Sequence, residues 1–254
     1  MLADDKRWTK LPDQVADWLR IQKDRSVIPK RNQLLIETFP RGARYYMVCY
    51  PFEGRLAHQT LGMLLTRRLE RARLRPVGFV ATDYSLAIWA LGDLPRAFTD
   101  GRPALAALFD EDMLGDDLED WMADSYLLKR MFRNTALISG LIEKRHPGKE
   151  KTGRQVTIST DLVYDVLRKH EPNHILMRAT WADAATGLLE IGRVGEMLAR
   201  IRGHIVHKAL DRISPLAIPA MLQIGRESVA SGDADEHVLR EAADDLIKEA
   251  LGDG

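Results

Sequence analysis

QLLIETFPRGARYYMVCY, residues 33–50, decides the fold of this chain. Two apolar runs, QLLIETF and RYYMVCY, flank the four residues Pro40-Arg41-Gly42-Ala43. The runs are rich in β-branched and aromatic residues, which favour strands. Proline presets φ and glycine tolerates positive φ, so the residues between the runs are typical of a tight turn. The stretch therefore predicts an antiparallel β-hairpin.

The segments on either side of this hairpin extend the prediction. Residues 12–25 suit a helix with Pro12 at its first turn, where the missing N–H costs nothing. Residues 55–74 place their apolar side chains on one arc of a helix and most of their arginines on the other. Residues 76–82 and 84–91 are two more strand-like runs. Four strands with one amphipathic helix between the pairs make a small α+β lobe.

From about residue 103 onward helical periodicity dominates. The predicted fold class is α+β, with a small antiparallel sheet of two hairpins and an amphipathic helix, followed by a larger, mostly helical lobe. The expected domains are 1–102, including the N-terminal connecting helix, and 103–254, packed together. Two prolines predict an extended passage through residues 214–222. The expected helices of the second lobe are 118–145, 161–170, 175–190, 196–205 and 236–251.

Composition excludes several classes of protein. The 254 residues contain 37 basic and 37 acidic side chains, so the net charge argues against a generic polyanion binder. No stretch has the length of a membrane span or a signal peptide, and a cytoplasmic protein is expected. A single cysteine, Cys49, excludes a disulfide framework and is interpreted as a small core residue rather than a reactive thiol.

Charge is nevertheless distributed unevenly along the chain. Residues 41–75 contain eight arginines against two glutamates, whereas residues 110–124 contain eight acidic residues and no basic one. Such a split lets one face attract phosphate while another repels it, although both runs could be solvated helix faces. Arg68 and His58 fall inside the apolar arc of the helix over 55–74. We interpret Arg68 as one member of a structural ion pair and His58 as a hydrogen-bonded core histidine.

His170-Glu-Pro-Asn-His174 spells the H-E-x-x-H pattern of zinc hydrolases. That chemistry needs both imidazoles one turn apart on a continuous helix. Pro172 clashes with a preceding helical turn and pushes Glu171 toward an extended conformation. We therefore expect His170 to end one helix and the next to start near Pro172, and no metal is predicted.

A basic segment follows the expected helix 118–145. It resembles a phosphate loop but lacks the order G-x-x-x-x-G-K-[ST]. Two glycines would let the backbone approach a ligand, and lysine and arginine neutralise phosphates. A loop without a ligand is the alternative. The candidate nucleic-acid contacts in this segment are Lys144, Arg145, Lys149, Lys151 and Arg154.

Aromatic side chains matter because any base can stack on a ring. Trp8 lies in a polar stretch and is the candidate stacking platform, although it could instead dock on a neighbouring domain. The remaining tryptophans sit among apolar neighbours and are predicted to lie in the core. They are Trp18, Trp89, Trp121 and Trp181.

Several long segments carry a family resemblance. They are ETFPRGARYYMVCYPFEGRLAHQTLG (37–62), FDEDMLGDDLE (109–119), FRN (132–134), RHPGK (145–149) and SPLA (214–217). Together they resemble the region that follows the helicase core in large helicase-related (Lhr) proteins. The sequences of these segments are most similar to those of the ligase-associated DEXH-box branch, and the resemblance covers essentially the whole chain.

The resemblance implies a function that the residues alone do not. Such helicases carry two RecA-like ATPase domains and a winged helix, use ATP and magnesium, move 3′ to 5′ on single-stranded DNA and are linked to DNA repair. This sequence contains no Walker A motif, DEXH box or arginine-finger motif, so no cofactor is expected in this chain and ATP hydrolysis by it alone is not expected.

We therefore expect a nucleic-acid-binding accessory region that helps to form the single-strand channel of such a helicase. Arg41, Arg44, Arg55 and the segment 144–154 would contact phosphates, which positions a strand without reading its sequence. Its partners would be single-stranded nucleic acid, expected to be DNA, and the motor and winged-helix domains. The alternative is a protein-docking module that holds the motor domains, or a ligase or nuclease, with little DNA contact. A metal-dependent hydrolase rests only on the H-E-x-x-H string.

Overall fold

The chain folds into two compact units. One is made of Met1–Met113 and Arg193–Gly254, and the other of Leu114–Gly192; we call them the sheet unit and the helical unit. This division differs from two contiguous lobes meeting at residue 102, because the chain returns to the sheet unit after its central helices. The computed structural model describes residues 11–124, 126–142, 145–146, 149–150, 152–187, 189–230 and 236–251.

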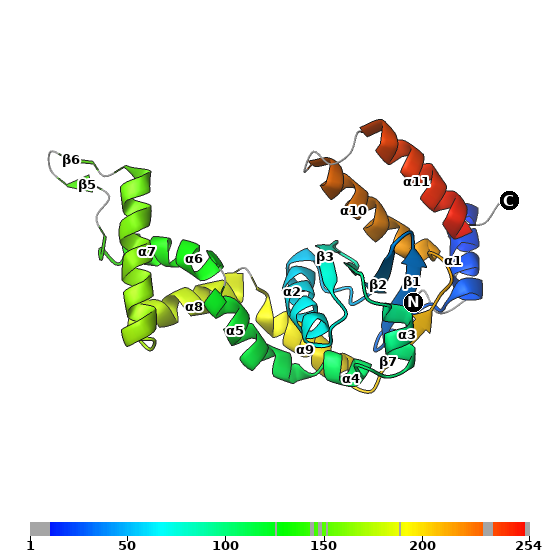
Figure 1. Cartoon of the computed structure of the whole chain (residues 1–254), viewed down its shortest axis with the longest axis horizontal. Coiled ribbons are helices and arrows are strands. Elements are labelled where there is room, and N and C mark those ends of the chain that lie inside the picture. Colours follow the sequence, from blue (N-terminus) through cyan, green and yellow to red (C-terminus); the bar gives the residue numbers. More distant parts are fainter. Residues whose placement is uncertain are drawn as a thin grey trace. The chain divides into compact units, whose positions relative to one another are not determined.

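A five-stranded mixed sheet forms the centre of the sheet unit, in the order β3-β4-β2-β1-β7 (Figure 1). β1 (Leu34–Arg41) and β2 (Arg44–Cys49) form the predicted first hairpin, and β3 (Pro76–Ala81) and β4 (Leu86–Ala90) form the second. The fifth strand, β7 (Ile205–Ala209), pairs in parallel with β1 and lies in a segment for which a helix end was predicted. The α+β class is confirmed, with one parallel strand more than the sequence indicated.

Helices cover both faces of this sheet. α2 (Arg55–Arg71) packs against β3 and β4, and α3 (Leu94–Thr99) packs against β1, β2 and β7. The opposite face is covered by η3 (Pro215–Ala217), α10 (Ile218–Ala230) and α11 (Glu236–Leu251). Burying a large apolar side chain stabilises a fold by about 1.5–3 kcal/mol. The core on the second face includes Leu35, Phe39, Val48, Val80, Ala87, Met221 and Leu246.

A buried polar network centred on Glu37 connects the sheet to the segments around it. Glu37 Oε2 accepts from the Tyr50 hydroxyl at 2.6 Å and from the Ser214 hydroxyl at 2.5 Å, while Oε1 accepts from Gln22 Nε2 at 2.8 Å. Gln22 Oε1 in turn accepts from the Leu216 N–H at 3.0 Å. Because buried donors need acceptors, this carboxylate fixes η3 and the first helix on the sheet.

The helix that supplies Gln22 is α1 (Asp13–Arg25), as predicted from Pro12 and the residues after it. Two short segments, α4 (Leu105–Leu108) and η2 (Glu111–Leu114), follow α3 toward the helical unit. None of the helices within the described ranges is both long enough and apolar enough to cross a membrane.

Two sequence predictions for the C-terminal half were wrong. The helix expected over 196–205 is α9 (Ile191–Ile201), which ends before Gly203, a glycine with φ +71° that leads into β7. The extended passage expected over 214–222 is η3 followed by α10. Pro215 and Pro219 lie in the first turns of these helices, where a missing N–H leaves no hydrogen bond unmade.

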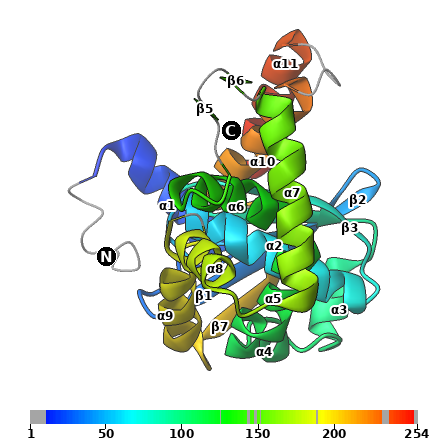
Figure 2. The same ribbon diagram turned by 90° about the vertical axis from the view of Figure 1, so that its left-hand side faces the viewer.

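In its described residues the helical unit contains four helices and a short two-stranded ribbon. In this unit α7 contacts both α6 and α8 (Figure 2). Arg133 on α6 and Asp161 on α7 form a bidentate ion pair, with both Nη2–Oδ distances 3.1 Å, and the rings of Phe132 and Tyr164 meet edge to face at 5.5 Å. The elements are α5 (Asp116–Asp124), α6 (Tyr126–Ile138), β5 (Arg145–His146), β6 (Lys149–Glu150), α7 (Gly153–His170) and α8 (Ile175–Gly187).

The single helix predicted over 118–145 is wrong, because α6 already ends at Ile138. Gly140 has φ +72°, and the Ile142 N–H donates to the Ala136 carbonyl at 3.1 Å. A left-handed glycine with a bond that reaches back across the last turn is a common way for a helix to stop. Arg145, which the sequence had placed at the end of this helix, lies in β5, and Lys144 lies outside the described residues.

Candidate nucleic-acid interface

One end of the sheet gathers aromatic rings and basic side chains. β2 ends there, β4 begins there opposite Cys49, and the loop before β1 lies beside them. We call this end the β2–α2 edge and define it by six exposed side chains. They are Lys30, Arg31, Phe52, Arg55, Tyr84 and Arg193.

Phe52 is the most unusual residue of the β2–α2 edge. Its φ is +60°, the left-handed region, which costs a residue with a side chain on the order of 1–3 kcal/mol. Its ring is 49% exposed and lies 6.5 Å from the ring of Tyr50, so the strained backbone does not bury it. Strain that brings an aromatic ring to the surface is a feature of binding sites rather than of cores.

His58 connects the loop that carries Phe52 to the turn between β3 and β4. Its Nε2 accepts from the Glu53 N–H at 3.0 Å, and its Nδ1 donates to the Thr82 carbonyl at 2.7 Å. Burial lowers the pKa of His58 below its ordinary value, more than the Thr82 bond raises it. The predicted hydrogen-bonded core histidine is confirmed, and it aligns the loops of Phe52 and Tyr84, whose side chain is 70% exposed.

Arginines from α9 hold the same loop from the other side. Arg200 donates to the Arg31 carbonyl at 2.8 Å and pairs with Glu53 Oε1 at 2.6 Å, which neutralises both charges. Arg193 Nη1 donates to the Glu53 carbonyl at 3.2 Å while the side chain stays exposed. The pairing of Glu53 leaves the edge with a basic excess.

Arg55 contributes the first residue of α2 to this edge. Its Nε lies 4.0 Å from Asp83 Oδ1 and its side chain is half exposed, so this contact is loose. The N-cap, Gly54, has no side chain to accept from the first N–H groups, and no acidic residue lies in the first turn. The positive end of the α2 dipole is therefore open to an anion.

A hollow of about 520 Å³ opens beside Phe52. Its walls combine apolar side chains, Leu19, Ile28 and Leu216, with the basic residues Lys30 and Arg31. Apolar walls with a few polar groups are typical of sites that accept a small ligand group. The β2–α2 edge therefore offers a stacking ring, a hollow and cations within one loop cluster.

The other two arginines predicted from the hairpin lie elsewhere. Arg41 and Arg44 are paired across the turn, at the end of the hairpin opposite to Arg55. Arg41 Nε forms an ion pair with Glu249 Oε2 at 3.2 Å, so much of its charge is already neutralised. Arg44 is exposed and forms no ion pair within the described part of the chain. Of the three, only Arg55 belongs to the aromatic edge.

The remaining predicted contacts belong to other parts of the chain. Arg154 is exposed in the first turn of α7, within the helical unit. β5 and β6 occupy part of the predicted basic loop, but the side chains of Arg145 and Lys149 are outside the described portion. Trp8, Lys144 and Lys151 also lie outside the described residues.

Sequence reasoning missed Phe52, Tyr84 and Arg193. Phe52 lies within the family segment 37–62, and its signal in the sequence is the neighbouring Gly54, which marks a loop with an unusual backbone conformation. The tryptophan prediction was wrong for Trp181, which is 40% exposed, because α8 buries a different stripe against α6. Arg68 forms the predicted structural ion pair, with Asp112, and donates to the Ala107 carbonyl at 2.6 Å.

The two histidines of the H-E-x-x-H string do not share a helix. α7 ends at His170, and α8 begins at Ile175, one residue after His174. Within the described ranges no group of three or more His, Cys, Asp or Glu side chains is arranged to hold a metal ion.

Comparison with known proteins places these features in context. A family model described as DEAD/H associated matches residues 28–217. The ATP-dependent helicase Lhr-Core of Methanocaldococcus jannaschii is 21% identical over 225 residues, which are 88% of this chain and 26% of that protein. The chain thus spans about a quarter of the length of this relative.

A solved structure has a similar fold. The Mycobacterium smegmatis helicase Lhr, in a structure bound to ssDNA and AMP-PNP, gives a TM-score of 0.63 at 20% identity. The match covers 86% of this chain and 29% of that one. These matches confirm the resemblance to Lhr-like helicases that the sequence segments carry.

Proposed function

This chain belongs to the DEAD/H associated family, and from that premise we propose that it binds single-stranded DNA as the accessory region of an ATP-dependent 3′-to-5′ repair helicase. Its relatives are named as helicases, and the solved one was bound to ssDNA. ATP and magnesium would be used by RecA-like domains, since this sequence has no Walker A motif. The expected setting is cytoplasmic, in the ligase-associated branch.

The observation that carries this proposal is the half-exposed ring of Phe52, which a backbone with positive φ holds among cations at the β2–α2 edge. A base can stack on the ring, and sequence plays no part because every base has a π-face. Arg55 and Arg193 lie close enough to the same loop to take the adjoining phosphates. Rings and cations on one edge are what a protein needs to hold a strand while a motor moves it.

The strand would use phosphate contacts for most of its affinity. Each neutralised phosphate releases condensed counterions, so the logarithm of the binding constant falls by roughly 0.7 per contact and per tenfold rise in salt. Arg44 and Arg154, both exposed, and Trp8, Lys144, Arg145, Lys149 and Lys151 remain proposed further contacts. Arg41 is a weaker candidate because it pairs with Glu249.

Fluorescence anisotropy with a labelled single strand at several salt concentrations tests the proposal. We expect Phe52→Ala to weaken binding by about 5- to 150-fold, the effect of one stacked base, without changing the salt slope. Arg55→Ala should weaken binding and reduce the slope by about one contact. Arg75→Ala removes an arginine from the opposite end of β3 and serves as the matched control.

The proposal would be abandoned if Phe52→Ala and Arg55→Ala bound strands as the unmodified chain does. If Phe52→Ala, Arg55→Ala and Arg75→Ala bound the strand with equal affinity, and that affinity did not change with salt, phosphate contacts would likewise be excluded as the basis of binding.

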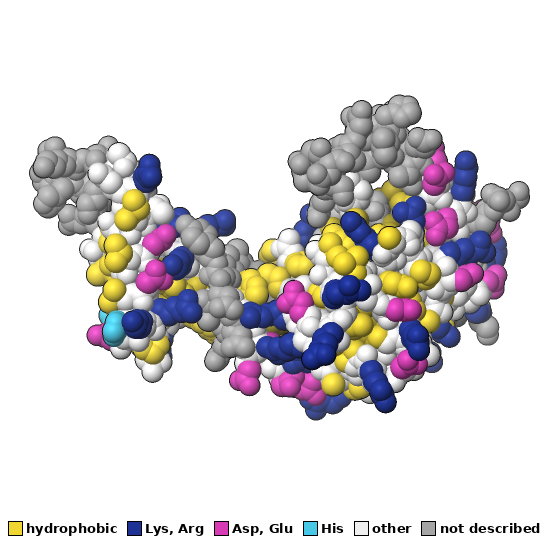
Figure 3. Space-filling view, viewed as in Figure 1, with side chains coloured by type: hydrophobic (Ala, Val, Ile, Leu, Met, Phe, Trp, Pro, Cys, Tyr) yellow, Lys and Arg dark blue, Asp and Glu magenta, His cyan; other side chains and the backbone are white. Residues whose placement is uncertain are grey.

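One observation favours a second function, docking of a protein domain. Ile158, Leu162 and Val166 lie one turn apart on α7 and are 53%, 62% and 51% exposed. Figure 3 shows apolar side chains along this side of α7. The chain matches only 26% of its relative, so the motor and winged-helix domains, a ligase or a nuclease could cover this stripe. Leu162→Lys should then abolish association with the motor domains in a pull-down without affecting strand binding.

A further inference from the structure

A second hollow lies within the helical unit, whereas the residues of the β2–α2 edge belong to the sheet unit. It encloses about 740 Å³ between α5, α6, α7 and α8, within the range of about 300–1,000 Å³ that small-molecule sites occupy. Its floor is apolar and ordered: Met122, Leu128 and Tyr164 are nearly fully buried. The hollow is therefore part of the packed unit rather than a gap between loose loops.

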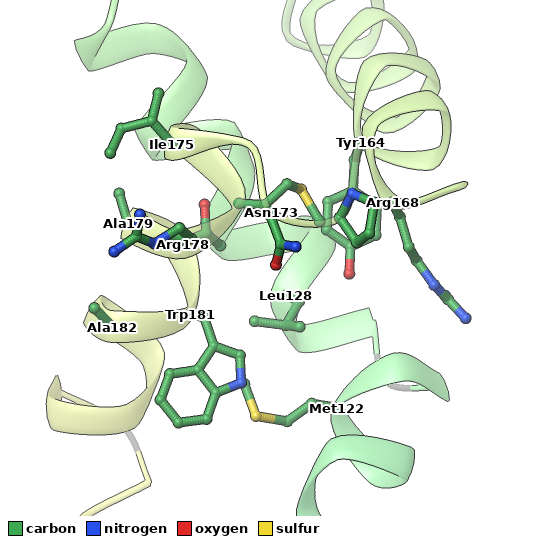
Figure 4. A pocket seen from close by; sticks show the side chains of 13 residues that line it. Met122, Leu128, Tyr164, Arg168, Asn173, Ile175, Arg178, Ala179, Trp181 and Ala182 are labelled. Atoms are coloured by element: carbon green, nitrogen blue, oxygen red, sulfur yellow. The ribbon is translucent and has the colours of Figure 1, made fainter. Parts of the chain in front are cut away.

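Trp181 forms one wall of this hollow (Figure 4). α8 turns Thr180 and Ala184 toward the core. The Thr180 hydroxyl donates to the Leu176 carbonyl at 2.7 Å and lies 3.1 Å from Thr135 Oγ1 on α6. Thr180 and Ala184 thus lie on the buried face of α8, whereas the next residue, Trp181, is turned away from that face and has 40% of its surface exposed. Leaving a large ring in water forgoes the stabilisation that burial would provide, so packing does not explain it.

Polar side chains line the same hollow. Arg178, one turn before Trp181 on α8, lies on one side of the hollow, and Arg168, near the end of α7, lies on the other (Figure 4). Asn173, from the loop between the helices, sits between them above Leu128. Arg178 is exposed and forms no ion pair with the other described residues.

This combination matches one kind of ligand group. An unstacked base needs a flat aromatic face, an amide that can both donate to and accept from its edge, and a cation for its phosphate. A purely apolar side chain from a protein partner would need the wall of Trp181, Met122 and Leu128, but neither the amide nor the guanidinium groups.

We propose that this hollow holds one unstacked base of a single strand, stacked on Trp181 with its edge at Asn173 and its phosphate at Arg178. The assignment rests on the proposed strand-binding function and adds a site in the other unit. A strand that used both sites would contact both units, whichever way they are arranged.

Intrinsic fluorescence tests this site because stacking quenches indole emission. The full chain is titrated with dAMP and with an oligothymidylate of about 12 nucleotides, within the site size of single-strand binding folds. Trp181→Phe identifies the fraction of the quench that comes from this residue, and Trp181→Ala and Arg178→Ala report affinity. Arg130→Ala, an exposed arginine on α6 outside the hollow, is the matched control. Thermal melts establish that each variant is folded.

We expect both ligands to quench the unmodified chain, with the quench lost in Trp181→Phe. Trp181→Ala should weaken oligothymidylate binding by about 5- to 150-fold, Arg178→Ala should lower its salt slope, and Arg130→Ala should change neither. An unchanged quench in Trp181→Phe, together with unchanged affinity in the two alanine variants, would overturn the site. If the chain still binds the strand when this site is overturned, the proposed strand-binding function of the β2–α2 edge remains supported.

Two other results also decide the question. If dAMP quenches the fluorescence but the chain does not bind oligothymidylate, the hollow takes free nucleotides. Both the assignment to a strand and the proposed strand-binding function are then overturned. Loss of strand binding in Phe52→Ala, with the dAMP quench of Trp181 intact, would support two separate sites.

Discussion

Replacing Glu37 with glutamine tests whether the buried carboxylate holds the sheet unit together. The carboxylate accepts three hydrogen bonds, from Gln22, Tyr50 and Ser214, and is fully buried. An amide has one oxygen. If the amide nitrogen of the new glutamine takes the place of Oε1, two donors, this nitrogen and Gln22 Nε2, face each other. If it takes the place of Oε2, the Tyr50 and Ser214 hydroxyls lose their acceptor.

Gln22 cannot rotate its amide to compensate, because its oxygen accepts from the Leu216 N–H and its nitrogen also donates to the Val27 carbonyl at 3.2 Å. At least one bond to a charged acceptor is lost, which costs about 1.5–3 kcal/mol. At about 2–4 °C per kcal/mol for a unit of this size, the melting temperature should fall by about 3–12 °C.

Urea unfolding followed by circular dichroism and tryptophan fluorescence measures the change. Glu70→Gln, an exposed glutamate at the end of α2, is the control and should stay within about 0.5 kcal/mol of the unmodified chain. In a Tyr50→Phe background the cost of Glu37→Gln should shrink, because one donor is already gone. Unchanged stability of Glu37→Gln, with an unchanged urea dependence, would refute the reasoning.

Three further predictions concern other buried groups. Arg68→Met should lower the free energy of unfolding by about 1.5–3 kcal/mol, because the Ala107 and Leu108 carbonyls lose a charged donor. Asp112→Asn should lower it by less, because the Asp112 side chain is largely solvated. Urea unfolding compares the two variants, and equal losses of stability would contradict this account. Burial raises the pKa of Cys49, so a thiol reagent at pH 8 should label it only in urea, and rapid labelling of the folded chain would contradict its core position. Burial lowers the pKa of both His58 and His207 in the folded chain, so their contribution to stability is present above the pKa of the unfolded chain, near 6.5, and is lost as the pH falls below it. His58→Gln should therefore reduce the drop in melting temperature between pH 7.5 and pH 5.5. An unaltered drop would exclude His58 as its source.

The local elements could largely be predicted from the sequence. Alternation and turn residues specify a hairpin within a few positions, so β1, β2, β3 and β4 were found, as was α1 after Pro12. The apolar arc of α2 also predicted correctly that His58 is buried and that Arg68 is partly buried, since a helix fixes which side chains share a face. The break between His170 and His174 followed from the geometry of Pro172 alone.

What sequence alone could not determine depends on contacts between distant segments. β7 is a short run whose pairing with β1 joins residues about 170 positions apart, and no local pattern indicates a parallel partner. The exposure of Trp181 and of Phe52 likewise depends on tertiary contacts. α8 buries Thr180 and Ala184 and so leaves Trp181 on another face, and His58 holds the loop that carries Phe52 through the Glu53 N–H. Residue type determined the elements and their buried faces; only tertiary packing decided which rings and cations remain at the surface together, because that depends on which side each element turns toward its neighbours.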